Sequence, residues 1–206
     1  MARRSVLYYL KELRRPVATT RDLSAVSGRS PSATVQALNH LREEGLVVKI
    51  YRGIWAEAGN EKLSPYSVIP FLFSRQRAYV SFVSALHLHG IIEQIPQVIT
   101  LASTLHTRVF HTAMGTYYVH RIHPLFFGGF GWYKGTGSFL IADPEKALVD
   151  CLYLSARKGK RFGRYPELHF PRSFHFNKTR EWVERIPDFR IRVCVRKRLD
   201  TLLRRS

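Results

Sequence analysis

The first apolar pattern in the chain predicts a short amphipathic helix. Val6, Leu10 and Leu13 recur at three- and four-residue spacing, so they share one face of a helix over residues 5–14. Pro16 ends this helix, because proline lacks a backbone donor and disrupts the preceding turn. We expect the apolar face to pack behind another helix.

The next residues carry the signals of two further helices. Leu23 and Val26 give the first of them an apolar face, and Ser27-Gly28 breaks it. Ser30-Pro31 then has the order of an N-cap and a first helical residue, where a missing N–H costs nothing.

In the third predicted helix the apolar and polar positions separate. Val35, Leu38 and Leu41 fall on one face. The opposite face carries short polar side chains and almost no charge: Ser32, Ala33, Gln36, Asn39 and His40. A helix that enters a major groove reads base edges with small hydrogen-bonding side chains, so this face is typical of DNA recognition.

A hairpin is predicted after the third helix. Residues 46–51 form a strand, and Arg52-Gly53 turns the chain back into a second strand that reaches Trp55. Lys49, Tyr51 and Arg52 lie on this hairpin, placed to touch phosphates or the minor groove. Residues 1–58 therefore predict a winged helix-turn-helix DNA-binding domain, and protein binding is the alternative use of the same fold.

A second domain is predicted over residues 66–206, after a short polar linker. Residues 66–76 and 79–89 have helical spacing. The glycine- and aromatic-rich stretch 126–132 is expected to fold back on a sheet, and a pocket rim or a partner surface is the alternative. Strands are predicted where the period changes to two, at 98–101, 108–110, 117–122 and 138–141. The fold class is α+β, an N-terminal winged helix-turn-helix followed by a mixed α/β C-terminal domain.

The C-terminal region combines an alternating pattern with strong positive charge. Aliphatic residues alternate with arginines over residues 190–196, which predicts a strand that presents Arg190, Arg192 and Arg196 on one face. Such a row suits a phosphate backbone. Residues 197–205 are interpreted as a basic segment for docking, for partner binding or for contact with solvent.

Composition favours a polyanionic partner. The chain has 33 Lys and Arg against 15 Asp and Glu, a formal net charge of +18 and a pI near 10.5. An anionic membrane is the competing partner, but no apolar run approaches the roughly 20 residues of a spanning helix. Cys151 and Cys194 lack metal or redox spacing, and no signal sequence is evident, so we expect a cytoplasmic protein.

We predict no catalytic site, metal or cofactor. The nine histidines lack zinc spacing, and the chain has neither a glycine-rich phosphate loop nor a nucleophile elbow. Asp143, Glu145 and Lys146 leave one alternative open, a metal-dependent nuclease or other nucleic-acid-processing enzyme with a winged-helix targeting domain. The same residues also form an ordinary helix start, with an N-cap Asp and a first-turn Glu.

Three stretches of the chain together resemble the AbiEi-like antitoxin family, the transcriptional regulators of bacterial abortive-infection (type IV) toxin–antitoxin systems. They are the N-terminal winged helix-turn-helix, residues 79–91 (YVSFVSALHLHGI) with 95–103 (IPQVITLAS), and residues 141–150 (IADPEKALVD). The chain departs from the family at Lys146, where arginine is usual.

The resemblance implies a repressor that binds inverted repeats in its own promoter. It also implies that the second domain opposes a nucleotidyltransferase-like toxin functionally, without a tight complex. The residue pattern itself predicts the DNA contacts. Base edges or adjoining phosphates are contacted by Arg29, Ser30, Ser32, Ala33 and Gln36, and the backbone is contacted through the wing by Lys49, Tyr51 and Arg52. The electrostatic footprint is extended by Arg190, Arg192 and Arg196.

Overall fold

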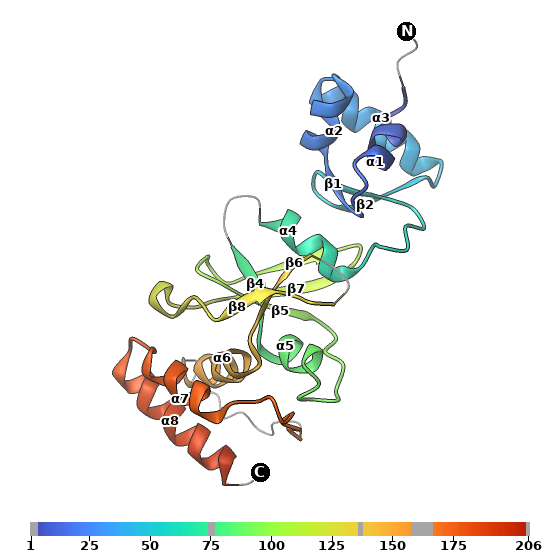
Figure 1. Cartoon of the computed structure of the whole chain (residues 1–206). Coiled ribbons are helices and arrows are strands. Elements are labelled where there is room, and N and C mark those ends of the chain that lie inside the picture. Colours follow the sequence, from blue (N-terminus) through green and yellow to red (C-terminus); the bar gives the residue numbers. More distant parts are fainter. Residues whose placement is uncertain (1–3, 74–76, 136–137, 158–166, 205–206) are drawn as a thin grey trace. The chain divides into compact units, whose positions relative to one another are not determined.

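The chain folds into a mixture of helices and strands, which confirms the α+β class. The structure is a computed structural model and describes residues 4–73, 77–135, 138–157 and 167–204. It divides into two compact units (Figure 1). Unit 1 comprises residues 1–75, 111–115 and 135–138, and unit 2 comprises the remaining residues. The units divide near residue 75, so the predicted linker at 59–65 lies inside unit 1.

Unit 1 begins with the three helices and the hairpin that the sequence predicts. The elements are α1 (Val6–Glu12), α2 (Thr20–Ser27), α3 (Pro31–Glu43), β2 (Val47–Tyr51) and β3 (Ile54–Glu57). A two-residue strand that the sequence did not reveal, β1 (Ala18–Thr19), pairs antiparallel with β3 and makes a sheet of order β1-β3-β2. The predicted helix at 66–76 is shorter, a 3-10 turn η1 (Pro65–Val68) followed by α4 (Ile69–Leu72).

A small apolar core holds these elements together. Its buried members come from all three helices and the sheet: Val6, Leu10, Ala18, Leu23, Leu38, Val47 and Trp55. Two predictions of burial were wrong in detail. Val26 is 45% exposed, and the buried face of α3 is centred on Thr34 and Leu38, with Val35 only partly buried. Thr34 is accommodated because its hydroxyl donates to the carbonyl of Ser30 at 2.9 Å.

Unit 2 is built on a six-stranded sheet of order β6-β7-β5-β4-β9-β8. The strands are β4 (Ala78–Val80), β5 (Ile99–Ser103), β6 (Arg108–Thr112), β7 (Gly115–Arg121), β8 (Phe130–Trp132) and β9 (Leu140–Ala142). The helices are α5 (Phe82–Leu88), α6 (Pro144–Arg157), α7 (Phe176–Glu184) and α8 (Phe189–Leu203), with a 3-10 turn η2 (Pro124–Phe126). β5 runs parallel to β7, and β4 runs parallel to β9.

Two of the predicted elements that precede α6 in unit 2 differ from the structure. Residues 79–89 do not form one helix, because Val80 pairs with Leu101 and Ile141 in the sheet and the helix starts only after Ser81. The glycine- and aromatic-rich stretch contributes strand β8 as well as a loop. The expectation that its rings fold back on the sheet is met only in part: Phe130 stacks on Tyr79 with ring centroids 4.5 Å apart, whereas Trp132 is 67% exposed.

A fully buried ion pair lies at the start of α6. The ammonium group of Lys146 donates to the carboxylate of Asp150 and to the hydroxyl of Tyr79, and Asp150 also accepts from Ser81 at 2.7 Å. The Lys146 ammonium lies 3.8 Å from the ring centroid of Phe126. Burial lowers the pKa of Lys146, opposed by the attraction of Asp150. The network joins α6 to β4 and to the start of α5.

Removing one member of this pair should destabilise unit 2 strongly. Lys146→Met leaves Asp150 as an uncompensated buried charge, which costs about 3–5 kcal/mol. Arg196→Met removes a cation from an exposed pair with Glu184 and should cost about 0–1 kcal/mol. Urea unfolding of both variants measures the difference. Equal free energies of unfolding would contradict the role assigned to the buried pair.

Candidate nucleic-acid interface

The N-terminus of α3 is formed by the turn and cap that the sequence predicts. Gly28 ends α2 in the left-handed region, at a φ of 63°, which glycine adopts without strain. Ser30 is the N-cap, and its hydroxyl oxygen accepts from the backbone N–H of Ala33 at 3.3 Å. Pro31 is the first helical residue. These residues fix where α3 begins and therefore which side chains its outer face presents.

The outer face of α3 is polar and open to solvent. Ser32, Gln36 and His40 are exposed and follow one another at four-residue intervals, each step a rise of about 6 Å. Ala33 and Asn39 are half-buried at the edges of this stripe. The small side chains leave room for close approach, whereas the buried residues Thr34 and Leu38 hold the opposite face in the core.

The side chain of Arg29 is less exposed to solvent than the sequence pattern predicts. It is half-buried, and its guanidinium group donates to the backbone carbonyl of Arg4 at 3.2 Å. The guanidinium carbon of Arg4 lies 4.3 Å from the ring centroid of Tyr8. The sequence pattern did not predict that Arg4 and Tyr8 lie near the start of α3. Part of the hydrogen-bonding capacity of Arg29 is therefore used within unit 1.

Two of the three predicted contact residues of the hairpin are exposed to solvent. Lys49 and Arg52 are exposed, and Tyr51 is half-buried. Two hydrogen bonds of Thr20 connect the hairpin to the start of α2. The backbone N–H of Thr20 donates to the carbonyl of Gly53 at 2.8 Å. The hydroxyl of Thr20 accepts from the indole N–H of Trp55 at 3.0 Å. Thr20 and Trp55 therefore fix the position of the hairpin relative to the helices of unit 1, a role that spacing alone did not reveal.

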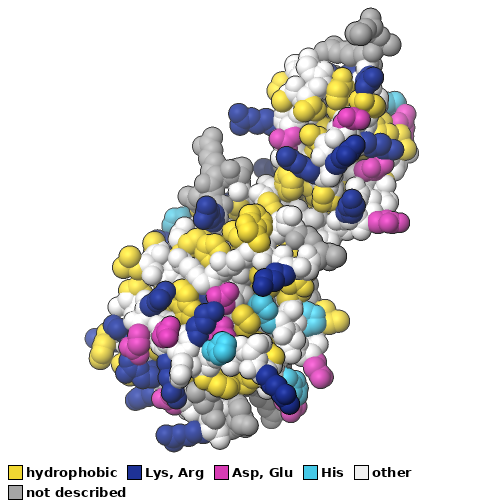
Figure 2. Space-filling view, in the orientation of Figure 1, with side chains coloured by type: hydrophobic (Ala, Val, Ile, Leu, Met, Phe, Trp, Pro, Cys, Tyr) yellow, Lys and Arg dark blue, Asp and Glu magenta, His cyan; other side chains and the backbone are white. Residues whose placement is uncertain are grey.

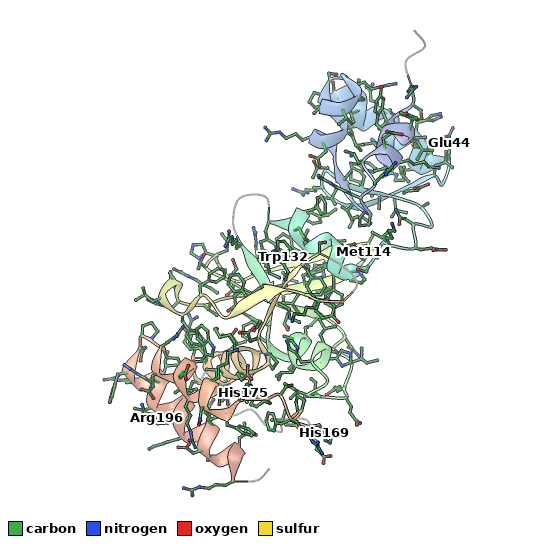
Figure 3. The ribbon with its side chains drawn as sticks, in the orientation of Figure 1. Glu44, Met114, Trp132, His169, His175 and Arg196 are labelled. Atoms are coloured by element: carbon green, nitrogen blue, oxygen red, sulfur yellow. The ribbon has the colours of Figure 1, made fainter. Side chains whose placement is uncertain are left out.

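The predicted strand with Arg190, Arg192 and Arg196 on one face was wrong. These residues lie on α8, where successive residues turn by about 100°, so Arg190 points away from the other two. Arg192 donates to the backbone carbonyl of Glu184 at 3.2 Å, and Arg196 pairs with the carboxylate of Glu184 at 2.5 Å (Figure 3 labels Arg196). The three arginines do not form a single row.

The residues of the nuclease alternative have other partners. Lys178 pairs with Asp143 at 3.0 Å and with Glu145 at 3.5 Å, and Glu145 also accepts from the backbone N–H of His175 at 2.9 Å. Lys146 belongs to the buried pair with Asp150. Over the part of the chain that the structure describes, no group of three His, Cys, Asp or Glu side chains is placed to hold a metal ion.

Among the helices that the structure describes, none combines the length and the apolar character that crossing a bilayer requires.

Residues 6–58, which contain all the elements from α1 to β3, match a family described as "Transcriptional regulator, AbiEi antitoxin". The match confirms the AbiEi-like resemblance for this part of the chain and associates the segment with a transcriptional-regulator antitoxin family. No curated protein matches the chain.

The cap of α3 gives a stability test within this segment. Ser30→Ala removes the acceptor for the Ala33 N–H and should lower the free energy of unfolding of unit 1 by about 1 kcal/mol. Gln36→Ala is the control, because Gln36 is exposed on the same helix and does not contact the cap. Thermal unfolding of both variants checks the expectation. A loss as large in Gln36→Ala would show that the cap is not the cause.

Proposed function

We propose that residues 1–58 form a winged helix-turn-helix domain that binds double-stranded DNA, with α3 in the major groove and the hairpin as its wing. The supporting observation is the exposed polar stripe of α3 in a segment that matches a transcriptional-regulator family. Leu38 is buried on the opposite face of α3 and holds the helix in the core, and Ser30 caps the start of the helix.

Base reading is assigned to the exposed side chains of α3. The amide of Gln36 has a donor and an acceptor, so it can bond bidentately to the N6 and N7 atoms of adenine. Ser30 and Ser32 donate to base edges or to adjoining phosphates. Ala33 gives the close approach, and its methyl group can contact a thymine methyl.

Affinity that does not depend on sequence is assigned to the cations of unit 1. Lys49 and Arg52 on the wing and Arg29 beside α3 contact phosphates, with half-buried Tyr51 supporting the wing. Each neutralised phosphate releases condensed counterions, so binding should weaken steeply with salt. The formal net charge of +18 strengthens the attraction at long range.

The biological role follows from the family description. We propose that the chain is a repressor of its own operon and the antitoxin of a type IV-like toxin–antitoxin pair in the cytoplasm. Inverted repeats in the promoter would then be read by two copies, because a two-fold operator matches two-fold related domains. The partner is a nucleotidyltransferase-like toxin, opposed functionally rather than through a tight complex.

Gln36→Ala should reduce discrimination between operator and random DNA by about 1–3 kcal/mol, because the bidentate contact is lost. Gln97→Ala is the control, an exposed glutamine in unit 2. Fluorescence anisotropy with both duplexes measures the two affinities. Equal loss of affinity on operator and random duplexes would refute the role of Gln36.

Arg52→Ala should weaken binding to operator and random DNA alike. Because one phosphate contact is removed, the slope of log affinity against log salt should become shallower by about 0.9. The matched control is Arg42→Ala, an exposed arginine near the end of α3. A salt slope that stays at the wild-type value would exclude a contact between Arg52 and phosphate.

A further inference from the structure

The outer side of α8 and its C-cap residue, Arg204, carry a row of three exposed cations. Arg190, Lys197 and Arg204 follow one another at seven-residue intervals. Seven residues bring an α-helix to within about 20° of two full turns and advance it by about 10.5 Å. The three side chains therefore form a nearly straight row about 21 Å long, which we call the α8 row.

The other sides of α8 are used for packing within unit 2. Val195 and Leu199 are buried on the side opposite the row. On one flank Arg198 donates to the hydroxyl of Ser155 on α6, and on the other flank Arg196 pairs with Glu184 on α7. The α8 row is thus the part of the helix surface that these packing contacts leave open.

Four acidic residues lie on or beside α7 and α8 (Glu181, Glu184, Asp188 and Asp200), and none forms an ion pair with the row among the described residues. Glu184 pairs with Arg196, Asp188 caps the start of α8, and Asp200 lines a groove between α7 and α8 together with Arg180. In contrast, within the described ranges the side chains of the α8 row have no hydrogen-bond or ion-pair partner. Figure 2 shows Lys and Arg side chains over the region of α7 and α8, with Asp and Glu side chains among them. Asp200 is a neighbour of Lys197 and Arg204 on the helix surface, three residues after the first and four before the second, but no ion pair joins it to either among the described residues.

We propose that the α8 row binds the phosphate backbone of duplex DNA without regard to base sequence. This inference rests on the proposed DNA-binding function and adds to it a second contact surface, in unit 2. A rigid row of separate cations is complementary to a regular line of phosphates, and each contact adds a counterion-release contribution. A membrane surface is favoured less, because helices that lie on bilayers turn an apolar face to the lipid. The apolar residues Val195 and Leu199 of α8 are buried, although Phe189 at the start of the helix is 71% exposed.

The test compares two full-length variants of equal net charge. One carries Arg190→Gln, Lys197→Gln and Arg204→Gln. The control carries Arg77→Gln, Lys134→Gln and Arg172→Gln, three exposed cations elsewhere in unit 2. A third variant, with Arg190→Lys, Lys197→Arg and Arg204→Lys, keeps the charge of the row. Anisotropy is measured on a random duplex and on the promoter duplex between 50 and 200 mM salt, and circular dichroism verifies the fold.

The α8 variant should show a salt slope shallower by about 2.7, three contacts at about 0.9 each, on both duplexes. The ratio of promoter to random affinity should stay at the wild-type value, and the variant that keeps the charge should bind like the wild type. An α8 variant that matches the control would overturn the inference alone. A wild-type protein that ignores both duplexes would overturn the proposed function as well.

Vesicles of phosphatidylserine form the second arm of the experiment. The α8 row should add nothing to vesicle binding that the control cations do not. If the α8 variant alone lost vesicle binding and kept the wild-type salt slope on DNA, the row would serve a membrane and the inference would be overturned.

Discussion

The orientation of α3 in unit 1 depends on the burial of one of its faces. Thr34 and Leu38 have no exposed surface, and Leu38 packs with Val6, Leu10, Leu23 and Trp55. Burying a leucine side chain contributes about 1.5–3 kcal/mol, so rotating α3 about its axis would be costly. This single constraint determines that Ser32, Gln36 and His40 face solvent. The base-reading stripe is the consequence of a packing requirement on the opposite side of the helix.

Unit 2 depends on a different kind of contact, a buried polar network. Lys146 and Asp150 could not be buried separately, because each charge would lack a partner. Their hydrogen bonds with Tyr79 and Ser81 fix α6 against β4. A Cβ atom at position 129 would lie 2.4 Å from the indole ring of Trp182, so glycine is the residue that fits there. The aromatic loop can therefore close over Lys146, and α6 then supports the helices that carry the C-terminal cations.

The sequence predicted unit 1 well and the C-terminal region poorly, for physical reasons. Caps and breakers are local, so Ser30, Pro31 and Gly28 were sufficient to place α3. The strand β1 has only two residues and no period, and its pairing with β3 is a tertiary contact. Over residues 190–196 the alternation fits a strand, whereas the wider spacing of Ile191, Val195 and Leu199 fits a helix. An alternation over seven residues is too short to distinguish a strand from a helix.

The candidate site shows the same division between local and tertiary information. The exposure of Gln36, Lys49 and Arg52 followed from period and turn chemistry. The contact of Arg29 with the carbonyl of Arg4, and the bond between Thr20 and Trp55, join residues far apart in the chain and have no local signature.

The most direct measurement is a titration of the isotopically labelled full-length protein with a duplex of its promoter at low salt, followed by NMR. Docking of α3 and the wing predicts that the backbone amide signals of residues 30–40 and 49–53 shift most within unit 1. Absence of binding, or shifts in unit 1 confined to the buried side of the helices, would contradict the claim that the polar face of α3 meets DNA.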